Sequence, residues 1–92
     1  MTTSLSPVHV LKAQADRTAA ILKAAERGER VAGDAGGKIA AARARDTVTF
    51  AVVMDDKIIK IEMAWTTIRD TSEAGIAEFI LNQMRDARDK VH

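Results

Sequence analysis

Residues 47–65 carry the pattern that most constrains the fold, because large apolar side chains alternate there with small or polar ones. Alternation at every second residue is typical of a strand that buries one face. The pattern runs on both sides of Asp55-Asp56, so we predict an antiparallel hairpin whose two-residue loop is this pair. A shift by one residue would scatter the apolar side chains over both faces, which fixes the register. The expected cross-strand pairs are Val52 with Ile59, Phe50 with Ile61 and Val48 with Met63.

An isolated hairpin is at best marginally stable in water, so other elements must cover its apolar face. The first candidate is the N-terminal segment. Ser6-Pro7 is a typical helix start, with the serine as N-cap and the proline at the first helical position. Apolar residues then recur at steps of three and four, which predicts an amphipathic helix of about 20–25 residues. It is expected to end near Gly28 or Val31, and residues 1–5 are expected to form a flexible tail.

The segment between this helix and the hairpin contains the clearest interruption of the pattern. Residues 33–37 are Gly-Asp-Ala-Gly-Gly and are expected to form a glycine-rich linker. The alanine-rich run Lys38–Arg45 has high helix propensity, which favours a short second helix, with a loop as the alternative.

A last helix is expected after the hairpin. The second strand is expected to end at Trp65, and residues 66–69 to connect it to the helix with Ile68 turned inward. The sequence Asp70-Thr71-Ser72-Glu73 is typical of a capping box with Asp70 as N-cap, although Thr71 or Ser72 could cap instead. Beyond it, apolar residues again recur at helical spacing.

These elements predict an α+β fold in which residues 1–92 form a single domain. Its order is a long helix, a short helix, an antiparallel hairpin and a last helix. The core is small, because 17 residues are alanine and only three are aromatic. Part of the burial is therefore expected to come from a second copy, and a homodimer that joins hairpin edges would complete the sheet. The residues expected in the core or the dimer interface are Val48, Phe50, Val52, Ile59, Ile61, Met63, Trp65, Phe79 and Ile80.

Composition argues against several classes of function. The chain has no cysteine, no apolar run long enough to span a membrane and no secretory signal, so we expect a cytoplasmic protein without membrane contact. His9 and His92 have no neighbouring ligands at metal spacing, and turn chemistry accounts for Asp55-Asp56. The glycines do not have the spacing of a phosphate-binding loop. We therefore expect no catalytic residue, no metal, no cofactor and no enzymatic activity.

A set of basic residues is the remaining candidate site. The formal net charge is +1, yet basic residues outnumber acidic ones in residues 1–46, and the reverse holds in residues 47–92. Acidic residues are interleaved, so one interpretation is an ordinary solvated surface. The other is a face that binds the phosphates of double-stranded DNA when a dimer aligns two copies. The candidate nucleic-acid-binding residues are Arg17, Lys23, Arg27, Arg30, Lys38, Arg43 and Arg45.

The order of segments adds a resemblance. A long helix, a polar glycine-containing stretch, a strand pair and a capped helix follow one another, carried by residues 30–37, 47–54, 57–62 and 76–90. This order resembles the YbaB/EbfC family of small bacterial nucleoid-associated proteins. Two features depart from the family pattern: residues 38–46 separate the glycine stretch from the strand, and no proline follows the second strand. The resemblance implies a homodimer whose protruding helices contact DNA with little sequence preference, and it transfers no individual contact residue.

Three classes of function remain. The first is a non-catalytic dimer that binds double-stranded DNA. The alternative is a protein-interaction or scaffold module, in which the long helix docks a partner helix or the hairpin edge captures a strand. That alternative predicts an exposed apolar stripe on the first helix. The third is a ligand-binding domain or enzyme with a pocket near residues 33–38. The DNA-binding hypothesis makes the sharpest predictions.

Overall fold

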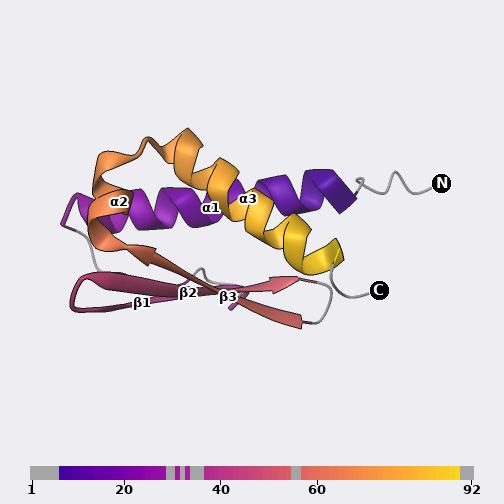
Figure 1. The fold of residues 1–92 in the computed structure, drawn as a ribbon, viewed down its shortest axis with the longest axis horizontal. Helices are drawn as coiled ribbons and strands as arrows, with labels where there is room; N and C mark the ends of the chain where they lie inside the picture. The colour runs from indigo at the N-terminus through magenta and orange to yellow at the C-terminus, as the bar shows by residue number, and fades with distance from the viewer. Residues whose placement is uncertain (1–6, 29–30, 32, 34–36, 55–56, 90–92) are drawn as a thin grey trace.

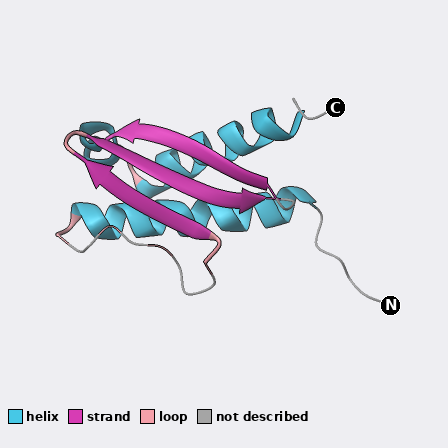
Figure 2. Ribbon diagram, turned by 90° about the horizontal axis from the view of Figure 1, so that it is seen from below, coloured by secondary structure: helices cyan, strands magenta, loops and turns pink. Residues whose placement is uncertain are grey.

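A three-stranded antiparallel sheet lies against two long helices in the computed structural model, which describes residues 7–28, 31, 33, 37–54 and 57–89 (Figure 1). In chain order the elements are α1 (Pro7–Glu26), β1 (Ile39–Ala44), β2 (Thr47–Met54), β3 (Lys57–Ala64), α2 (Trp65–Asp70) and α3 (Glu73–Asp89). Helices α1 and α3 pack on each other and cover one face of the sheet, while the other face has no helix on it (Figure 2). The α+β class predicted from the sequence is confirmed.

Several predictions concern residues outside this description. They are the tail at residues 1–5, the N-cap Ser6, the candidate site residue Arg30 and the loop Asp55-Asp56.

The predicted hairpin register is confirmed. Strands β2 and β3 pair antiparallel, and Val52 lies opposite Ile59, Phe50 opposite Ile61 and Val48 opposite Met63. Val48, Phe50 and Val52 are fully buried under the helices, because alternation sends all three to the same face of the sheet. On the outer face Val53 pairs with Ile58, which is 64% exposed.

The short helix predicted at residues 38–45 is wrong, because Ile39–Ala44 forms the edge strand β1. It pairs antiparallel with β2, and Ile39, opposite Val52, is buried. Alanine favours a helix in isolation, but strand pairing and the burial of Ile39 outweigh that intrinsic preference. The sheet therefore has three strands, and the hairpin edge that β1 covers is unavailable to another chain.

The connector after β3 also differs from the prediction. Strand β3 ends at Ala64, and Trp65 begins the short helix α2 rather than ending a strand. Ile68 is fully buried, as expected. The N-cap of α3 is Ser72, whose hydroxyl accepts a hydrogen bond of 3.1 Å from the backbone N–H of Gly75. Of the three capping alternatives, the structure selects Ser72 because Glu73 is already the first helical residue.

The core is a layer between the sheet and the two helices. Of the residues predicted for the core or interface, Ile59 and Trp65 are half-buried and Phe79 is 38% exposed. The others are buried: Val48, Phe50, Val52, Ile61, Met63 and Ile80. The apolar stripe of α1 is covered along its length, since Leu11, Ala15, Ala19, Leu22 and Ala25 are all buried. The exposed stripe expected for a helix-docking module is therefore not present between Leu11 and Ala25.

Helix α1 ends where the sequence predicts. The backbone N–H groups of Arg27 and Gly28 still bond to carbonyls of the last helical turn, and Gly28 then has a φ of 100°. Glycine adopts this left-handed conformation without the steric penalty of a β-carbon, so it ends the helix here.

Candidate nucleic-acid interface

Three segments that are far apart in the sequence meet at one end of the molecule: the last turn of α1, the turn between β1 and β2, and helix α2 (Figures 1 and 2). Hydrogen bonds to backbone carbonyls hold these segments together. The N–H of Trp65 donates to the carbonyl of Asp46 over 2.7 Å, and Lys23 bonds to carbonyls at the end of α2. We call this region the basic end, after Lys23, Arg27, Arg43, Arg45 and Arg69.

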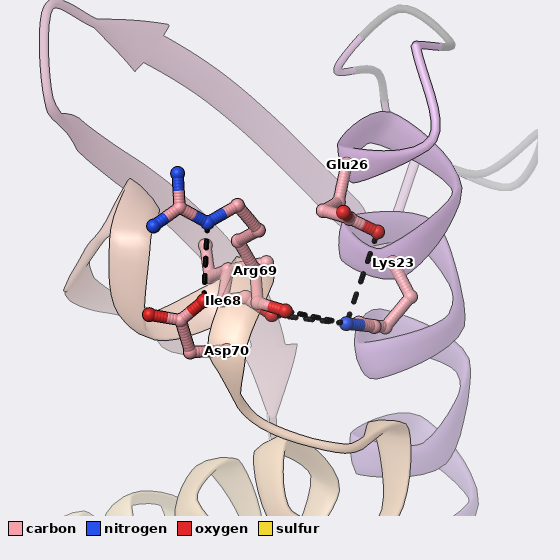
Figure 3. A network of polar contacts seen from close by, with 5 residues as sticks. All are labelled: Lys23, Glu26, Ile68, Arg69 and Asp70. Carbon is pink, nitrogen blue, oxygen red and sulfur yellow. Dashed lines mark hydrogen bonds and ion pairs between the residues drawn. The ribbon is translucent and has the colours of Figure 1, made fainter.

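Lys23 connects α1 to α2 (Figure 3). Its Nζ donates to the carbonyl oxygens of Ile68 and Arg69, each over 3.2 Å, and lies 3.8 Å from a carboxylate oxygen of Glu26. A cation at the last carbonyls of a helix satisfies acceptors that have no partner within the helix. The side chain of Lys23 is only 17% exposed. The structure thus gives this predicted DNA contact a role in the fold, and we leave it out of the interface proposed below.

Arg69 lies beside Asp70 on the same helix. Its Nε donates to a carboxylate oxygen of Asp70 over 3.1 Å, and both side chains are more than half exposed. The hydrogen bond and the negative charge of Asp70 raise the pKa of Arg69 above its usual value. Asp70 offsets part of the charge of Arg69, so this arginine contributes less field than an unpaired one.

Arg43 stacks on the single tryptophan. Its guanidinium carbon lies 4.2 Å from the centroid of the Trp65 ring, and its Nε donates to the carbonyl of Arg45 over 3.0 Å. A cation over the face of an indole is attracted by the ring quadrupole. Among the described residues no carboxylate pairs with this guanidinium, and Arg43 is exposed.

Arg45 occupies the first position of the two-residue turn between β1 and β2, since Ala44 pairs with Thr47. Its φ is 58°, a left-handed conformation that side chains other than glycine and asparagine seldom adopt. The side chain is exposed at the tip of this hairpin. Arg27, at the end of α1, is exposed as well.

The structure separates the other predicted cations from this group. Arg17 lies in the middle of α1, and Lys38 precedes β1, at the opposite end of that strand from Arg43. Both are exposed. The seven candidates therefore do not form one surface: Lys23, Arg27, Arg43 and Arg45 gather at the basic end, Arg17 and Lys38 lie elsewhere, and Arg30 is outside the described residues.

Sequence reasoning missed Arg69. It follows the buried Ile68 in a segment expected to be a plain connector, and it lies in the half of the chain where acidic residues predominate. A helical assignment for residues 65–70 would have brought it to the same end as the β1–β2 turn. The stacking role of Trp65 was missed for the same reason, because a strand-end tryptophan was expected to point into the core.

Other kinds of site are weakly supported. Among the described residues, no three His, Asp or Glu side chains gather closely enough to hold a metal ion. No helix in the described part of the chain is long and apolar enough to cross a membrane. A groove of about 240 Å³ lies between α1 and α3, and another of about 400 Å³ lies beside β3. The second is lined by Met63, Ile76 and Phe79 among others.

Comparison with known proteins gives no further guide, because no family model, curated protein or solved structure matches this chain.

Proposed function

We propose that this protein is a non-catalytic binder of double-stranded DNA, which it contacts through the phosphate backbone with little sequence preference. The observation that carries the proposal is the convergence of Arg27, Arg43 and Arg45 at the basic end, from two segments that only the fold brings together. As part of the same proposal, the protein is cytoplasmic and acts as a homodimer, so that two such ends are available to one duplex.

The charge balance at this end supports the proposal. Within the described ranges the carboxylates there are Glu26, Asp46 and Asp70, and two of them are already paired: Glu26 with Lys23 and Asp70 with Arg69. Arg27, Arg43 and Arg45 thus outnumber the third carboxylate, Asp46. Phosphate binding by such arginines releases condensed counterions from DNA, which favours association at low salt.

The positions of the arginines favour phosphates over bases. They lie on a hairpin turn and at a helix end, and no helix at this end presents an exposed face lined with amide or guanidinium groups for the major groove. Guanidinium groups bind phosphate oxygens in a bidentate manner, and such contacts position a protein without reading sequence.

The fold also supports the resemblance to nucleoid-associated proteins in one respect. Residues 38–46 interrupted the family pattern when they were expected to be helical. Strand β1 in fact begins at Ile39, two residues after Gly37. The glycine stretch therefore leads directly into the sheet, as it does in the family that the sequence resembles.

The proposal is tested by the binding of a fluorescent duplex of arbitrary sequence, measured by anisotropy across a salt series. We expect affinity to fall steeply with salt. Arg27→Gln and Arg45→Asn each remove one phosphate contact, so each should weaken binding to all sequences alike and reduce the salt slope by about 1. Asparagine at position 45 tolerates the left-handed backbone.

Arg85→Gln is the matched control, because it removes one exposed positive charge from α3, whose C-terminal half lies at the opposite end of the molecule (Figure 1). It should leave the salt slope unchanged. The proposal is wrong if the wild-type protein does not bind the duplex at low salt, or if all three variants behave alike.

A protein-interaction module remains the second candidate function. The observation in its favour is the groove beside β3, where Phe79 is 38% exposed at a position expected for a core or interface residue. This groove lies next to an unpaired strand edge and is the subject of the inference below.

A further inference from the structure

Strand β3 is an edge strand whose outward backbone groups can be identified. The N–H of Trp65 donates to Asp46, and the N–H of Val53 donates to Lys38. Backbone groups alternate in direction along a strand. Ile59, Ile61 and Met63 therefore bond to β2, while the N–H and C=O groups of Ile58, Lys60 and Glu62 and the N–H of Ala64 point outward. The carbonyl of Ala64, the N-cap of α2, belongs to that helix instead. In the described part of the chain, none of these outward groups has a backbone partner in a turn, loop or cap.

The two edges of the sheet differ. At the β1 edge, Gly33 approaches Ile39 so closely that a β-carbon on Gly33 would clash with the Ile39 carbonyl oxygen. The chain before β1 thus covers part of that edge. At the β3 edge the described residues leave a groove of about 400 Å³ between the strand and the helices α2 and α3. An uncovered edge of this kind can pair with another strand.

We propose that β3 pairs antiparallel with β3 of a second copy, with Ile61 on the two-fold axis. The two sheets then form one continuous six-stranded sheet with both pairs of helices on the same face. In this register Lys60 lies opposite Glu62 of the second copy, and Ile58 lies opposite Ala64. Lys60 and Glu62 both point outward, so their backbone groups can exchange two hydrogen bonds. In the second pair the N–H of Ala64 can donate to the carbonyl of Ile58, while the carbonyl of Ala64 caps α2.

Charge selects this register over its neighbours. A pairing centred on Lys60 would oppose two lysines, and one centred on Glu62 would oppose two glutamates. A pairing centred on Ile59 or Met63 would place neither Lys60 nor Glu62 opposite an unlike charge. Only the pairing centred on Ile61 opposes unlike charges, and symmetry makes it do so twice. Like charges directly opposite one another destabilise a strand pair, whereas unlike charges stabilise it.

The groove beside β3 suits the same arrangement. Met63 lines it together with Ile76 and Phe79. With Ile61 on the axis, Ile59 of the second copy lies opposite Met63 on the helix-covered face. Ile59 is only half-buried in a single chain, so pairing would place its remaining apolar surface against this groove. Phe79, which protrudes into the groove, would be covered in the same step.

The test is the dimer dissociation constant, measured by sedimentation equilibrium for wild type and charge variants. Lys60→Glu and Glu62→Lys each place like charges opposite one another at two positions, so each should raise the dissociation constant about tenfold. The double variant Lys60→Glu/Glu62→Lys restores both pairs and should return it to near the wild-type value. Glu78→Lys is the matched control: it lines the groove between α1 and α3 and should not change dimerisation.

A disulfide test reads the register directly, because the chain contains no cysteine. The Cα atoms of a hydrogen-bonded antiparallel pair lie about 5.5 Å apart, within reach of a disulfide. The variant Ile58→Cys/Ala64→Cys should therefore form a covalent dimer on oxidation. Ile58→Cys/Glu62→Cys would cross-link in a register centred on Lys60 or on Glu62, and should remain uncrosslinked in the register centred on Ile61.

A wild-type protein that stays monomeric at high micromolar concentration would overturn this inference. An unchanged dimer dissociation constant in both single charge variants would also overturn it, because the interface would then lie elsewhere. A monomer that still binds DNA with the expected salt slope would remove the strand pairing and the homodimer, and would leave the proposed DNA binding through the basic end intact. A dimer that responds to the charge variants as expected but binds no DNA would support the strand pairing and overturn the proposed DNA binding.

Discussion

The guanidinium carbon of Arg43 lies over the ring of Trp65, 4.2 Å from its centroid, and this contact joins the edge strand β1 to the first residue of α2. It is the one contact at the basic end that links a predicted DNA-binding cation to the only tryptophan in the chain. The intrinsic fluorescence of the protein therefore reports on this end alone.

Arg43→Gln should expose the face of Trp65 to solvent. We expect a red shift of the emission, stronger quenching by acrylamide and a loss of about 0.5–1 kcal/mol in the free energy of unfolding, the usual range for an exposed cation–π pair. Arg43→Lys should recover only part of the effect, because an ammonium lacks the planar surface that stacks on the indole. Unchanged quenching in Arg43→Gln would contradict the stack.

Lys23 is expected to matter for stability more than its surface charge suggests. Lys23→Met keeps the aliphatic stem but leaves the carbonyls of Ile68 and Arg69 without their charged donor. We expect a loss of about 1–2 kcal/mol, measured by urea unfolding, since hydrogen bonds to charged groups are stronger than neutral ones. Lys12→Met is the control, because its ion pair with Asp16 is 61% and 52% exposed. It should cost less than about 0.5 kcal/mol, and equal losses in the two variants would contradict the connecting role of Lys23.

The hairpin could be predicted from the sequence because two independent strands of alternating residues must agree on one register. Phe50 opposite Ile61 and Val48 opposite Met63 satisfy that requirement with no knowledge of the helices. The first helix and its end at Gly28 were equally accessible, since periodicity and a glycine C-terminal to it are local signals.

Strand β1 could not be predicted in the same way. Its residues Ala40, Ala41, Ala42 and Ala44 carry almost no strand pattern, because alanine intrinsically favours a helix and only Ile39 shows which side is buried. Its conformation depends on β2, a tertiary partner that lies beyond the β1–β2 turn. The basic end could not be predicted either, because its geometry depends on strand β1. Arg43 and Arg45 reach α2 only because β1 and its turn deliver them there.

A pair of proline substitutions distinguishes strand from helix at this segment. Ala42 lies opposite Thr49 as a hydrogen-bonded pair, whereas the N–H of Ala41 points away from β2. Ala42→Pro should therefore destabilise the fold by about 3 kcal/mol, and Ala41→Pro should cost much less, since proline is tolerated where an edge N–H faces outward. The midpoints of thermal unfolding measure both. A helix would make the two variants similarly harmful.

Gln14 gives a last prediction, because its side chain joins α1 to the backbone of the sheet. Its Nε2 donates to the carbonyl of Val53 over 2.6 Å, beside the start of β1. The residue is only 8% exposed. Gln14→Leu preserves the volume but removes this side-chain hydrogen bond to a partly buried carbonyl, so we expect a loss of about 0.5–1.5 kcal/mol by urea unfolding.

The buried Thr18 is a control on the same helix. Its hydroxyl donates to the carbonyl of Gln14, which already belongs to the helical ladder. Thr18→Val removes that donor without leaving a carbonyl unsatisfied, so it should change stability by less than about 1 kcal/mol. A larger loss in Thr18→Val than in Gln14→Leu would mean that the end of the sheet does not depend on Gln14. In that case the carbonyl of Val53 must find its donor in solvent, and α1 would be held on the sheet by apolar packing alone.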